Sequence, residues 1–549
     1  MAASLGGERG MQLGAMQDWP LRLMRLVDHA EREHPAGEIV TRWADGRITR
    51  TNWREAASNA RRTARALERL GIQRHDRVAT LAMNHEHHLL AWYGAVGMGA
   101  ILHTLNPRLF EDQLEYIANH AEDRVLLYDR AFSAVVERMK PRWTTIEHFI
   151  CMDPAKGEAG FPQWIAGEDD DYEWAEGHER EPCGLCYTSG TTGNPKGVIY
   201  EHRSTMLHTL ACVSPDVFDV SNRSVVLPIV PMFHANAWGV PWAAPHSGAK
   251  LVLSADYTPD AMCDLMRDEG VTHSAGVPTV WLGLIDHVER TGADLGRLRH
   301  VTIGGSAAPR AMIRWFRDRG IRVMHAWGMT ETSPIGTCGT PPAGWDEMSD
   351  EEQVEYVARQ GRVPFNVELR IVDDEGNELP RDGIASGRLH ARGPWVIKRY
   401  FKAEDDATDA DQWFDTGDVA MLHPDGTMQI TDRSKDVIKS GGEWISSIEL
   451  ENAAVGCPGV AEAAAIGIPH PKWDERPLLL VVRANGCDVC EDDIRGHLAG
   501  HVSKWWLPDA IEFVEELPHT ATGKLSKKTL REQYRDYRFA DAEAMVGRD

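Results

Sequence analysis

The chain has 549 residues, of which 42% are hydrophobic and 26% charged, which is ordinary for a globular protein. That length is enough for about three or four domain-sized units, each with its own core. The formal net charge of −24 argues against a nucleic-acid partner and against an anionic membrane surface, because both are negatively charged. A few local lysines and arginines could still hold a nucleotide.

No targeting or membrane-spanning segment is expected. Met1 to Met16 lacks the charged start and apolar core of a secretory signal. No run approaches the roughly 18 apolar residues of a membrane-spanning helix. Met545 to Asp549 carries no prenylation, retention or peroxisomal tag. We therefore expect a cytoplasmic protein with no membrane partner.

Helical patterns and short apolar runs alternate over the first 320 residues. Residues 50–71 predict a helix, because apolar side chains recur near helical spacing. Strands are predicted at Val78–Ala82, Ala100–Thr104, Val125–Tyr128, Val225–Val230, Lys250–Leu253, Val271–Ala275 and Val301–Gly304. Further helices are predicted at Pro259–Asp268, Pro278–Arg290 and Arg310–Arg319. Strands that alternate with helices indicate an α/β fold with largely parallel sheets.

From Gln429 onward the predicted elements become shorter. The sequence predicts a turn at Thr431–Ser440 and then a Gly441-Gly442 break. A helix at Ser447–Ala454 and strands at Val460–Ile468 and Leu478–Val482 follow. This pattern predicts a small α+β domain at the C-terminal end.

A loop of small and hydroxyl-bearing residues spans Tyr187–Gly197. It contains Thr188, Ser189, Gly190, Thr191, Thr192 and Gly193, and Lys196 follows. The backbone N–H groups of such a loop can wrap an anion, while hydroxyls add donors or a metal contact. It is not the standard P-loop, because Pro195 precedes the lysine and Gly197 follows it. We predict a polyphosphate site, most simply for ATP.

Two Cys-x-x-Cys pairs, Cys183/Cys186 and Cys487/Cys490, allow a zinc site or redox pairs as alternatives. The first pair lies on an apolar segment, where alternate residues point to opposite faces, and the second lies in a polar turn far along the chain. We therefore favour buried or incidental thiols.

The phosphate loop and five later motifs resemble those of the AMP-forming adenylating enzymes, which include acyl-CoA synthetases, luciferases and peptide-synthetase adenylation domains. The resemblance runs from Trp19 to Leu530, and the motifs come in the family's order. The later motifs are Pro231–Trp238, Gly304–Pro309, Trp327–Thr332, Trp413–Asp418 and Leu517–Leu525. The resemblance implies a large N-terminal α/β domain of parallel or mixed sheets with flanking helices, residues 1–432, and a small mobile C-terminal α+β domain, residues 433–549.

The resemblance implies ATP and Mg²⁺ as ligands. Thr330 would contact the α-phosphate, and Glu331 would bind Mg²⁺, a hard ion that prefers carboxylate and phosphate oxygens; Thr188 would be a further metal contact. Asp418 would accept hydrogen bonds from both ribose hydroxyls, and Arg433 would contact ribose or phosphate. The small residues after Ile303 would lie against adenine. The other expected nucleotide-binding residues are Gly305, Ser306, Ala307, Ala326, Trp327, Gly328 and Met329.

The motif around His234 would lie beside the acid. In the family this histidine lies where the carboxylate, the pantetheine thiol and water meet. Amino-acid-activating relatives usually carry an aspartate just after this position, and Ala235 stands here instead, which weighs against an amino-acid substrate. Trp238 and Gly305 would line the pocket, and an indole there favours short or medium acyl groups.

Lys524 would place its ammonium between the carboxylate and the α-phosphate, where it offsets their repulsion. Lys435 matches the family's hinge position, about which the small domain turns between two half-reactions. Lys524 would then leave the site, and the face formed by Lys439, Gly441 and Gly442 would enter it for the reaction with coenzyme A. Glu443 departs from the basic or aromatic residues common thereabouts, so the contact of this segment with CoA stays open.

We predict an ATP-dependent carboxylic acid–CoA ligase, which forms acyl-AMP and pyrophosphate and then the CoA thioester and AMP. Its catalytic residues would be Lys524, His234, Glu331 and Thr330. The resemblance leans toward medium-chain acyl-CoA synthetases and the 3-(methylthio)propionate–CoA ligases of dimethylsulfoniopropionate breakdown, and a thioether suits an aromatic-lined pocket. The alternatives are an adenylating enzyme with another acceptor, such as a carrier protein or oxygen, and a non-catalytic nucleotide-binding protein. Relatives in the family are often homodimers.

Overall fold

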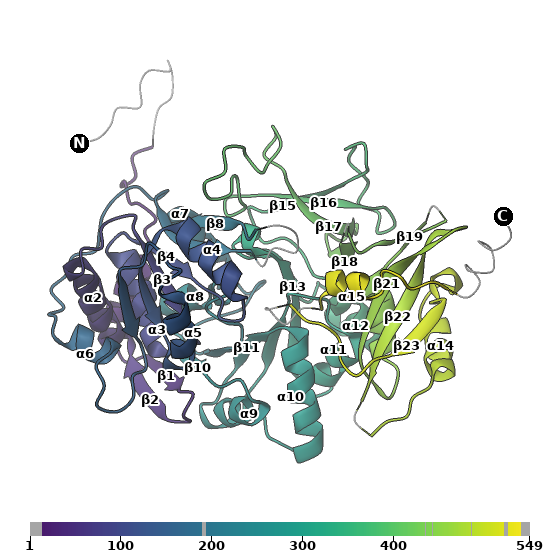
Figure 1. The fold of residues 1–549 in the computed structure, drawn as a ribbon, viewed down its shortest axis with the longest axis horizontal. Coiled ribbons are helices and arrows are strands. Elements are labelled where there is room, and N and C mark those ends of the chain that lie inside the picture. The colour runs from purple at the N-terminus through teal and green to yellow at the C-terminus, as the bar shows by residue number, and fades with distance from the viewer. Residues whose placement is uncertain are drawn as a thin grey trace.

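The computed structural model describes residues 14–188, 194–433, 435–441, 443–484, 486–520 and 525–539, with the backbone alone at 443 and 444. Two large sheets and their helices form the body of the molecule, a smaller sheet of strands β15–β18 lies along it, and the C-terminal strands and helices lie at one end (Figure 1). Within the described ranges, no helix combines the length and the apolarity needed to cross a membrane.

The first large sheet has eight strands in the order β14-β13-β12-β11-β9-β10-β1-β2. Its inner strands run parallel, while β14 and β2 pair antiparallel at the two edges. The strands are β1 (Glu38–Arg42), β2 (Ile48–Asn52), β9 (Val225–Pro228), β10 (Lys250–Ser254), β11 (His273–Gly276), β12 (His300–Ile303), β13 (Arg322–Gly328) and β14 (Ile335–Cys338).

The second large sheet has six strands in the order β6-β5-β3-β4-β7-β8. All neighbours run parallel except β8, which pairs antiparallel with β7 at one edge. The strands are β3 (Arg77–Leu81), β4 (Ile101–Thr104), β5 (Asp123–Tyr128), β6 (His148–Cys151), β7 (Pro182–Tyr187) and β8 (Gly197–Glu201). The prediction of largely parallel sheets with flanking helices is confirmed.

Helices pack in layers on both sides of these sheets. One core cluster joins both sheets to the helices between them: α1 (Met24–Glu33), α2 (Trp53–Arg69), α3 (Glu86–Gly97), α6 (Phe161–Ala166), α7 (His202–Cys212) and α8 (Val240–Ser247). A second covers the outer face of the six-stranded sheet with α4 (Glu111–Ala121) and α5 (Ser133–Met139). A third covers the eight-stranded sheet with α9 (Pro259–Asp268), α10 (Pro278–Thr291), α11 (Arg310–Arg317) and α12 (Asp350–Ala358).

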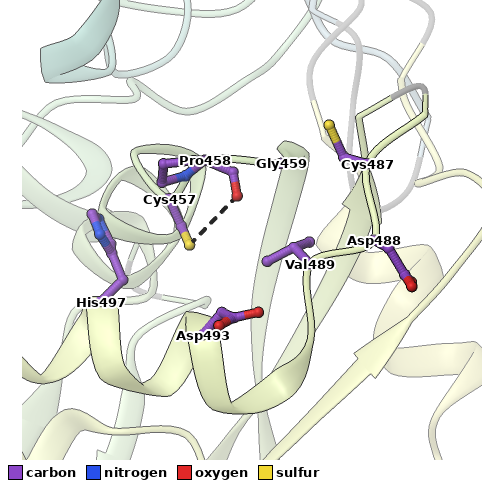
Figure 2. A pocket seen from close by; sticks show the side chains of 8 residues that line it. All are labelled: Cys457, Pro458, Gly459, Cys487, Asp488, Val489, Asp493 and His497. Atoms are coloured by element: carbon purple, nitrogen blue, oxygen red, sulfur yellow. Dashed lines mark hydrogen bonds between the residues drawn. The ribbon is translucent and has the colours of Figure 1, made fainter.

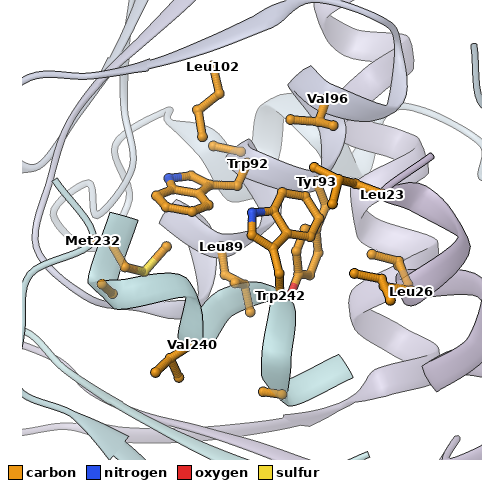
Figure 3. Packing of buried hydrophobic residues seen from close by; sticks show 14 of the residues in the cluster. Leu23, Leu26, Leu89, Trp92, Tyr93, Val96, Leu102, Met232, Val240 and Trp242 are labelled. Atoms are coloured by element: carbon orange, nitrogen blue, oxygen red, sulfur yellow. The ribbon is translucent and has the colours of Figure 1, made fainter. Parts of the chain in front are cut away.

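The contact between α3 and α8 lies at the centre of the largest cluster. Helix α3 is apolar around most of its circumference, as expected for a fully buried helix. Its Trp92 and Tyr93 face Trp242 of α8, with Leu23 and Leu26 at the side (Figure 3). The Tyr93 hydroxyl donates to the Pro241 carbonyl oxygen at 2.6 Å, which satisfies its one buried polar atom.

The third sheet is antiparallel, in the order β15-β16-β17-β18, and no strand was predicted before Gln429 in this region. The strands are β15 (Glu368–Val372), β16 (Ser386–Arg392), β17 (Phe414–Leu422) and β18 (Met428–Arg433). Its last pairing sets Asp418 of β17 opposite Arg433 of β18.

The C-terminal part is α+β, as predicted. Its sheet contains β19 (Ile438–Ser440), β20 (Glu443–Ile445), β21 (Val460–His470), β22 (Asp474–Arg483) and β23 (Ala510–Phe513). The helices α13 (Ser447–Val455) and α14 (Glu491–Ala499) cover one face, while α15 (Lys527–Gln533) packs against the other. The turn predicted at Thr431–Ser440 is shorter than expected, because its two ends belong to strands: β18 pairs with β17, and β19 pairs with β22.

Candidate functional site

Most predicted motifs meet at the carboxyl ends of parallel strands, the edge where α/β sheets usually bind ligands. In the eight-stranded sheet, His234 lies beyond β9, the Gly304–Pro309 segment follows β12 directly, and Glu331 lies just beyond β13. In the six-stranded sheet, the phosphate loop follows β7. Segments far apart in sequence are thereby brought to one region.

The base of the phosphate loop is closed by two hydrogen bonds. The Thr188 backbone N–H donates to the Lys196 carbonyl oxygen at 2.9 Å, and the Lys196 N–H donates to Thr188 Oγ1 at 3.3 Å. The Lys196 side chain is exposed. The predicted contacts of Ser189, Gly190, Thr191, Thr192 and Gly193 lie outside the described residues.

Thr330 and Glu331 form a buried turn after β13, and each is 7% exposed. The Thr330 carbonyl oxygen accepts a hydrogen bond from the Tyr200 hydroxyl at 2.8 Å. The Glu331 carboxylate accepts at Oε1 from the Tyr400 hydroxyl, also at 2.8 Å. Burial raises the pKa of Glu331, and the bond from Tyr400 opposes that rise. A buried carboxylate with one oxygen so held is suited to a cation at the other oxygen.

Asp418, Trp327 and Arg433, three of the predicted nucleotide-binding residues, lie together. The Trp327 indole N–H donates to Asp418 Oδ2 at 2.8 Å, and Arg433 Nε lies 3.4 Å from Asp418 Oδ1. Asp418 is buried, while the Arg433 side chain is half exposed. The carboxylate is therefore oriented from two sides.

Two glycines allow close backbone approach beside this group. A Cβ on Gly328 would lie 1.8 Å from the Pro334 carbonyl oxygen, so only glycine fits there. Gly305 has φ +84°, a conformation that favours glycine. The neighbouring predicted residues are placed with them: Ser306 exposed, Ala307 half-buried, Ala326 buried in β13, and Met329 bonded through its N–H to the Pro334 carbonyl.

His325 positions the segment after β12 and was not predicted. Its Nε2 accepts from the Ala308 backbone N–H at 3.2 Å, and its Nδ1 lies 3.1 Å from the carbonyl oxygens of Val357 and Ala358. Burial lowers the pKa of His325 to about 4, so the ring is neutral and can accept at one nitrogen.

The turn after His234 is left-handed. Ala235, Asn236, Ala237 and Trp238 have φ between 43° and 55°, and Gly239 continues at 85°. Each non-glycine residue in this conformation costs roughly 1–2 kcal/mol. The turn brings the Trp238 ring to 3.1 Å from the Cβ position of Gly304. The predicted substrate contact Trp238 therefore adjoins Gly304, the residue before the predicted contact Gly305, and the half-buried His234 lies at the start of the turn.

Asn84 holds the segment that leads to His234 and was also missed. Its Nδ2 donates to the carbonyl oxygens of Pro228 and Val230, both at 3.0 Å, and its Oδ1 accepts from the Met232 N–H at 2.7 Å. This buried amide thus fixes three backbone groups between β9 and the turn.

The predicted hinge residues lie where the third sheet meets the C-terminal part. Lys435 is exposed between β18 and β19, and Lys439 is exposed on β19. Gly441 has φ +62°, and its N–H donates to the Trp473 carbonyl at 2.7 Å. Gly442 and Lys524 lie outside the described residues.

One further group of potential metal ligands lies at the amino ends of strands β11 and β12 of the eight-stranded sheet. Asp219, His273 and His300 bring ligand atoms within 4.8 Å of one another. The pKa of His273 is lowered to about 3 and that of His300 to about 4, chiefly by burial, and the charges of Arg299 and Arg322 contribute to both shifts. Those guanidinium groups would repel a cation, so we assign no metal there.

A pocket of about 510 Å³ lies in the C-terminal part. Cys457, Cys487, Asp493 and His497 line it (Figure 2). Cys487 and Cys490 are exposed beside it, whereas Cys183 and Cys186 are buried in β7. The first Cys-x-x-Cys pair therefore lies in a strand of the six-stranded sheet, and the second lies between β22 and α14.

Comparison with known proteins gives the class. The chain matches the AMP-binding enzyme family over residues 27–401 and the AMP-binding enzyme C-terminal domain over residues 449–524. The ATP-bound structure of MatB from Rhodopseudomonas palustris aligns with a TM-score of 0.80 at 26% identity, covering 94% of this chain and 99% of that one. The chain belongs to the AMP-binding enzyme family, as its motifs predicted.

Curated relatives over nearly the whole length are CoA ligases. A 3-methylmercaptopropionyl-CoA ligase of Ruegeria lacuscaerulensis is 49% identical over 95% of this chain and 99% of its own length. A medium-chain-fatty-acid–CoA ligase of Ectopseudomonas oleovorans is 46% identical over 95% of this chain and 98% of its own length. These comparisons confirm the prediction of an enzyme of the ATP-dependent acyl-CoA ligase class.

Proposed function

We propose that this ligase joins a short- or medium-chain carboxylic acid to coenzyme A, with 3-methylmercaptopropionate or a medium-chain fatty acid as its substrate. The observation that carries the proposal is 46–49% identity to ligases named for these acids, over 95% of the chain. The packing of Trp238 against Gly304 supports it, because an indole beside the strand end shortens the space for an acyl chain.

Within that function, the ATP-binding residues are the phosphate loop with Thr188 and Lys196, the segments around Gly305 and Thr330, and the pair Asp418 and Arg433. Glu331 and Thr188 would hold Mg²⁺, which suits a buried carboxylate and a hydroxyl as hard oxygen ligands. When bound, the ion neutralises charge on the phosphates. His234 and Trp238 border the acid, and Lys524 offsets the repulsion between carboxylate and α-phosphate.

We further propose two domains, residues 1–432 and 433–549, that rotate about Lys435 between the half-reactions. The turn between β18 and β19 supports this, since it joins the third sheet to the C-terminal sheet and carries the exposed Lys435. Lys439, Gly441 and Gly442 would then face CoA. We also propose a cytoplasmic location. We propose in addition a homodimer, which sedimentation of the purified protein would test.

A panel of acids tests the substrate proposal. Butyrate, hexanoate, palmitate and 3-methylmercaptopropionate are each supplied with Mg-ATP and CoA, and kcat/KM is measured from pyrophosphate release. We expect the highest values for hexanoate and 3-methylmercaptopropionate. A strong preference for palmitate would contradict the short pocket. Acid-dependent release without CoA consumption would indicate another acceptor.

A further inference from the structure

One stretch of chain, residues 395–402, connects two of the nucleotide motifs. The Ile397 N–H donates to the Glu331 carbonyl oxygen at 2.8 Å, beyond β13 of the eight-stranded sheet. The Phe401 N–H donates to the Gly197 carbonyl oxygen at 2.8 Å, at the start of β8 in the six-stranded sheet. The backbone before Tyr400 is therefore bonded to the segment after β13, and the backbone after Tyr400 is bonded to β8 of the other sheet.

Tyr400 itself contacts one charged side chain from each motif. Its hydroxyl donates to Glu331 Oε1 at 2.8 Å, and the Lys196 ammonium lies 4.7 Å from the centroid of its ring. The first contact orients a carboxylate, and the second is an attraction between a cation and the π face. The tyrosine is half-buried, so the lysine side stays open to solvent.

Lys196 and Glu331 contact Tyr400 but form no salt bridge with each other. Within the described residues neither Lys196 nor Glu331 forms a salt bridge with any other group. A direct pair would neutralise both charges and leave neither for a ligand. Because each contacts Tyr400 and not the other, the ammonium remains available to phosphate and one carboxylate oxygen remains available to a cation.

We propose that Tyr400 is a positioning residue for the metal–nucleotide complex, holding the Glu331 carboxylate through its hydroxyl and the Lys196 ammonium through its ring. This inference rests on the proposed function, because it takes Glu331 as the metal ligand and Lys196 as a phosphate contact. Two parts of the side chain then have separate roles. The hydroxyl orients the carboxylate that binds the metal, and the ring holds the ammonium that contacts phosphate.

Two variants separate these roles. Tyr400→Phe removes the hydroxyl and keeps the ring, while Tyr400→Leu removes both. The dissociation constant of Mn²⁺ in the presence of ATP is measured by electron paramagnetic resonance, and that of ATP in EDTA by calorimetry. Tyr93→Phe is the control, because it also removes a hydroxyl that donates a hydrogen bond, at 2.6 Å to the Pro241 carbonyl oxygen, but one that contacts neither Glu331 nor Lys196.

We expect Tyr400→Phe to weaken Mn²⁺ binding about tenfold and to leave metal-free ATP binding unchanged, since hydrogen bonds to charged groups are the stronger ones. Tyr400→Leu should in addition weaken metal-free ATP binding about two- to fivefold. In a Glu331→Gln background the phenylalanine change should have no further effect on Mn²⁺ binding. The Tyr93→Phe control should change neither constant.

Unchanged Mn²⁺ binding in a folded Tyr400→Phe variant would overturn the inference, and so would equal losses in the presence and absence of Glu331. If the leucine variant fails to fold, the phenylalanine variant alone decides. If the acid panel shows no CoA ligation but Mn²⁺ binding still depends on Tyr400, the proposed function fails and the positioning role stands.

Discussion

Glu331 beside the nucleotide motifs and Glu451 in the C-terminal part are two largely buried carboxylates in opposite settings. Glu451 pairs with Lys527 Nζ at 2.8 Å and accepts from the Ala465 N–H at 2.8 Å. Lys527 also donates to Ser447 Oγ, which in turn donates to Asp432 at 2.6 Å. Glu331 has the Tyr400 hydroxyl as its side-chain partner and no salt bridge among the described residues.

Glu451 is thus a carboxylate whose charge is paired within the fold, whereas Glu331 is one that remains available to a ligand. A buried pair that loses one partner leaves an uncompensated charge, so Glu451 and Lys527 should act on stability. A buried carboxylate without a cation lowers the stability of the ligand-free protein, and a bound cation stabilises its charge. Substitution of Glu331 should therefore affect function. The predictions below test this contrast.

The largest effect is expected from Glu331→Gln. Because the amide is a poor Mg²⁺ ligand, we expect the rate of acid-dependent pyrophosphate release to fall by about 10²–10³, the loss typical of one preorganised electrostatic group. Stability should stay equal or rise, since a buried charge is removed. Activity and urea unfolding are measured on the same preparation. A destabilised variant with normal activity per folded molecule would break the contrast.

Lys527→Met should have the reverse effect. It leaves Glu451 and Asp432 without their buried cation, which should cost about 3–5 kcal/mol of unfolding free energy. Lys528→Met is the control, because Lys528 is exposed and its distance to Glu532 is 3.9 Å. Chemical denaturation of both variants checks this. A loss as small as that of the control would show that the network is not structural.

The pH dependence of stability offers a finer test. The pKa of Glu451 is raised from 4.5 to about 7, chiefly by burial. The folded state therefore binds this proton more tightly than the unfolded state does, and the stability that this group contributes falls as pH rises from about 4.5 to 7, by at most about 1.4 kcal/mol per pH unit. Glu451→Gln should flatten the stability profile between pH 5 and 7 relative to the parent. Parallel profiles would contradict this assignment.

The smallest effect concerns the left-handed turn beside the acyl pocket. Ala237 has φ 46°, so Ala237→Gly should relieve strain and raise stability by about 1 kcal/mol. Ala243→Gly, in the middle of α8, should instead lower it by about 0.5–1 kcal/mol. Thermal unfolding distinguishes the two signs. Destabilisation by both changes would show that the turn is not strained.

The sequence predicted many of the buried parallel strands, because strands covered on both faces are continuous apolar runs, but it missed β1, β6, β7 and β13. Val78–Ala82 corresponds to β3 (Arg77–Leu81), and Pro259–Asp268 is α9 without a shift. The antiparallel sheet was missed because its strands lack such runs. In β16, buried and half-buried residues alternate, and arginines and a histidine occupy the outer face.

The candidate-site residues that lie in sequence motifs could be predicted. Those that reach the site only through tertiary contacts could not. Glu331, Asp418 and Arg433 were predicted from their motifs, and the structure brings the last two together. Tyr400 lies 69 positions from Glu331, and Asn84 lies 148 from Met232, so no local pattern links either pair. The left-handed turn was equally hidden, because alanine and tryptophan rarely adopt positive φ.

The most direct test of the account is a product balance. Purified enzyme is given Mg-ATP, CoA and either hexanoate or 3-methylmercaptopropionate, and pyrophosphate, AMP and acyl-CoA are quantified together. We expect equal amounts of all three, none without the acid, and little from Glu331→Gln. Pyrophosphate formed without any acyl-CoA, or no product with either acid while palmitate is converted, would contradict the proposed ligase.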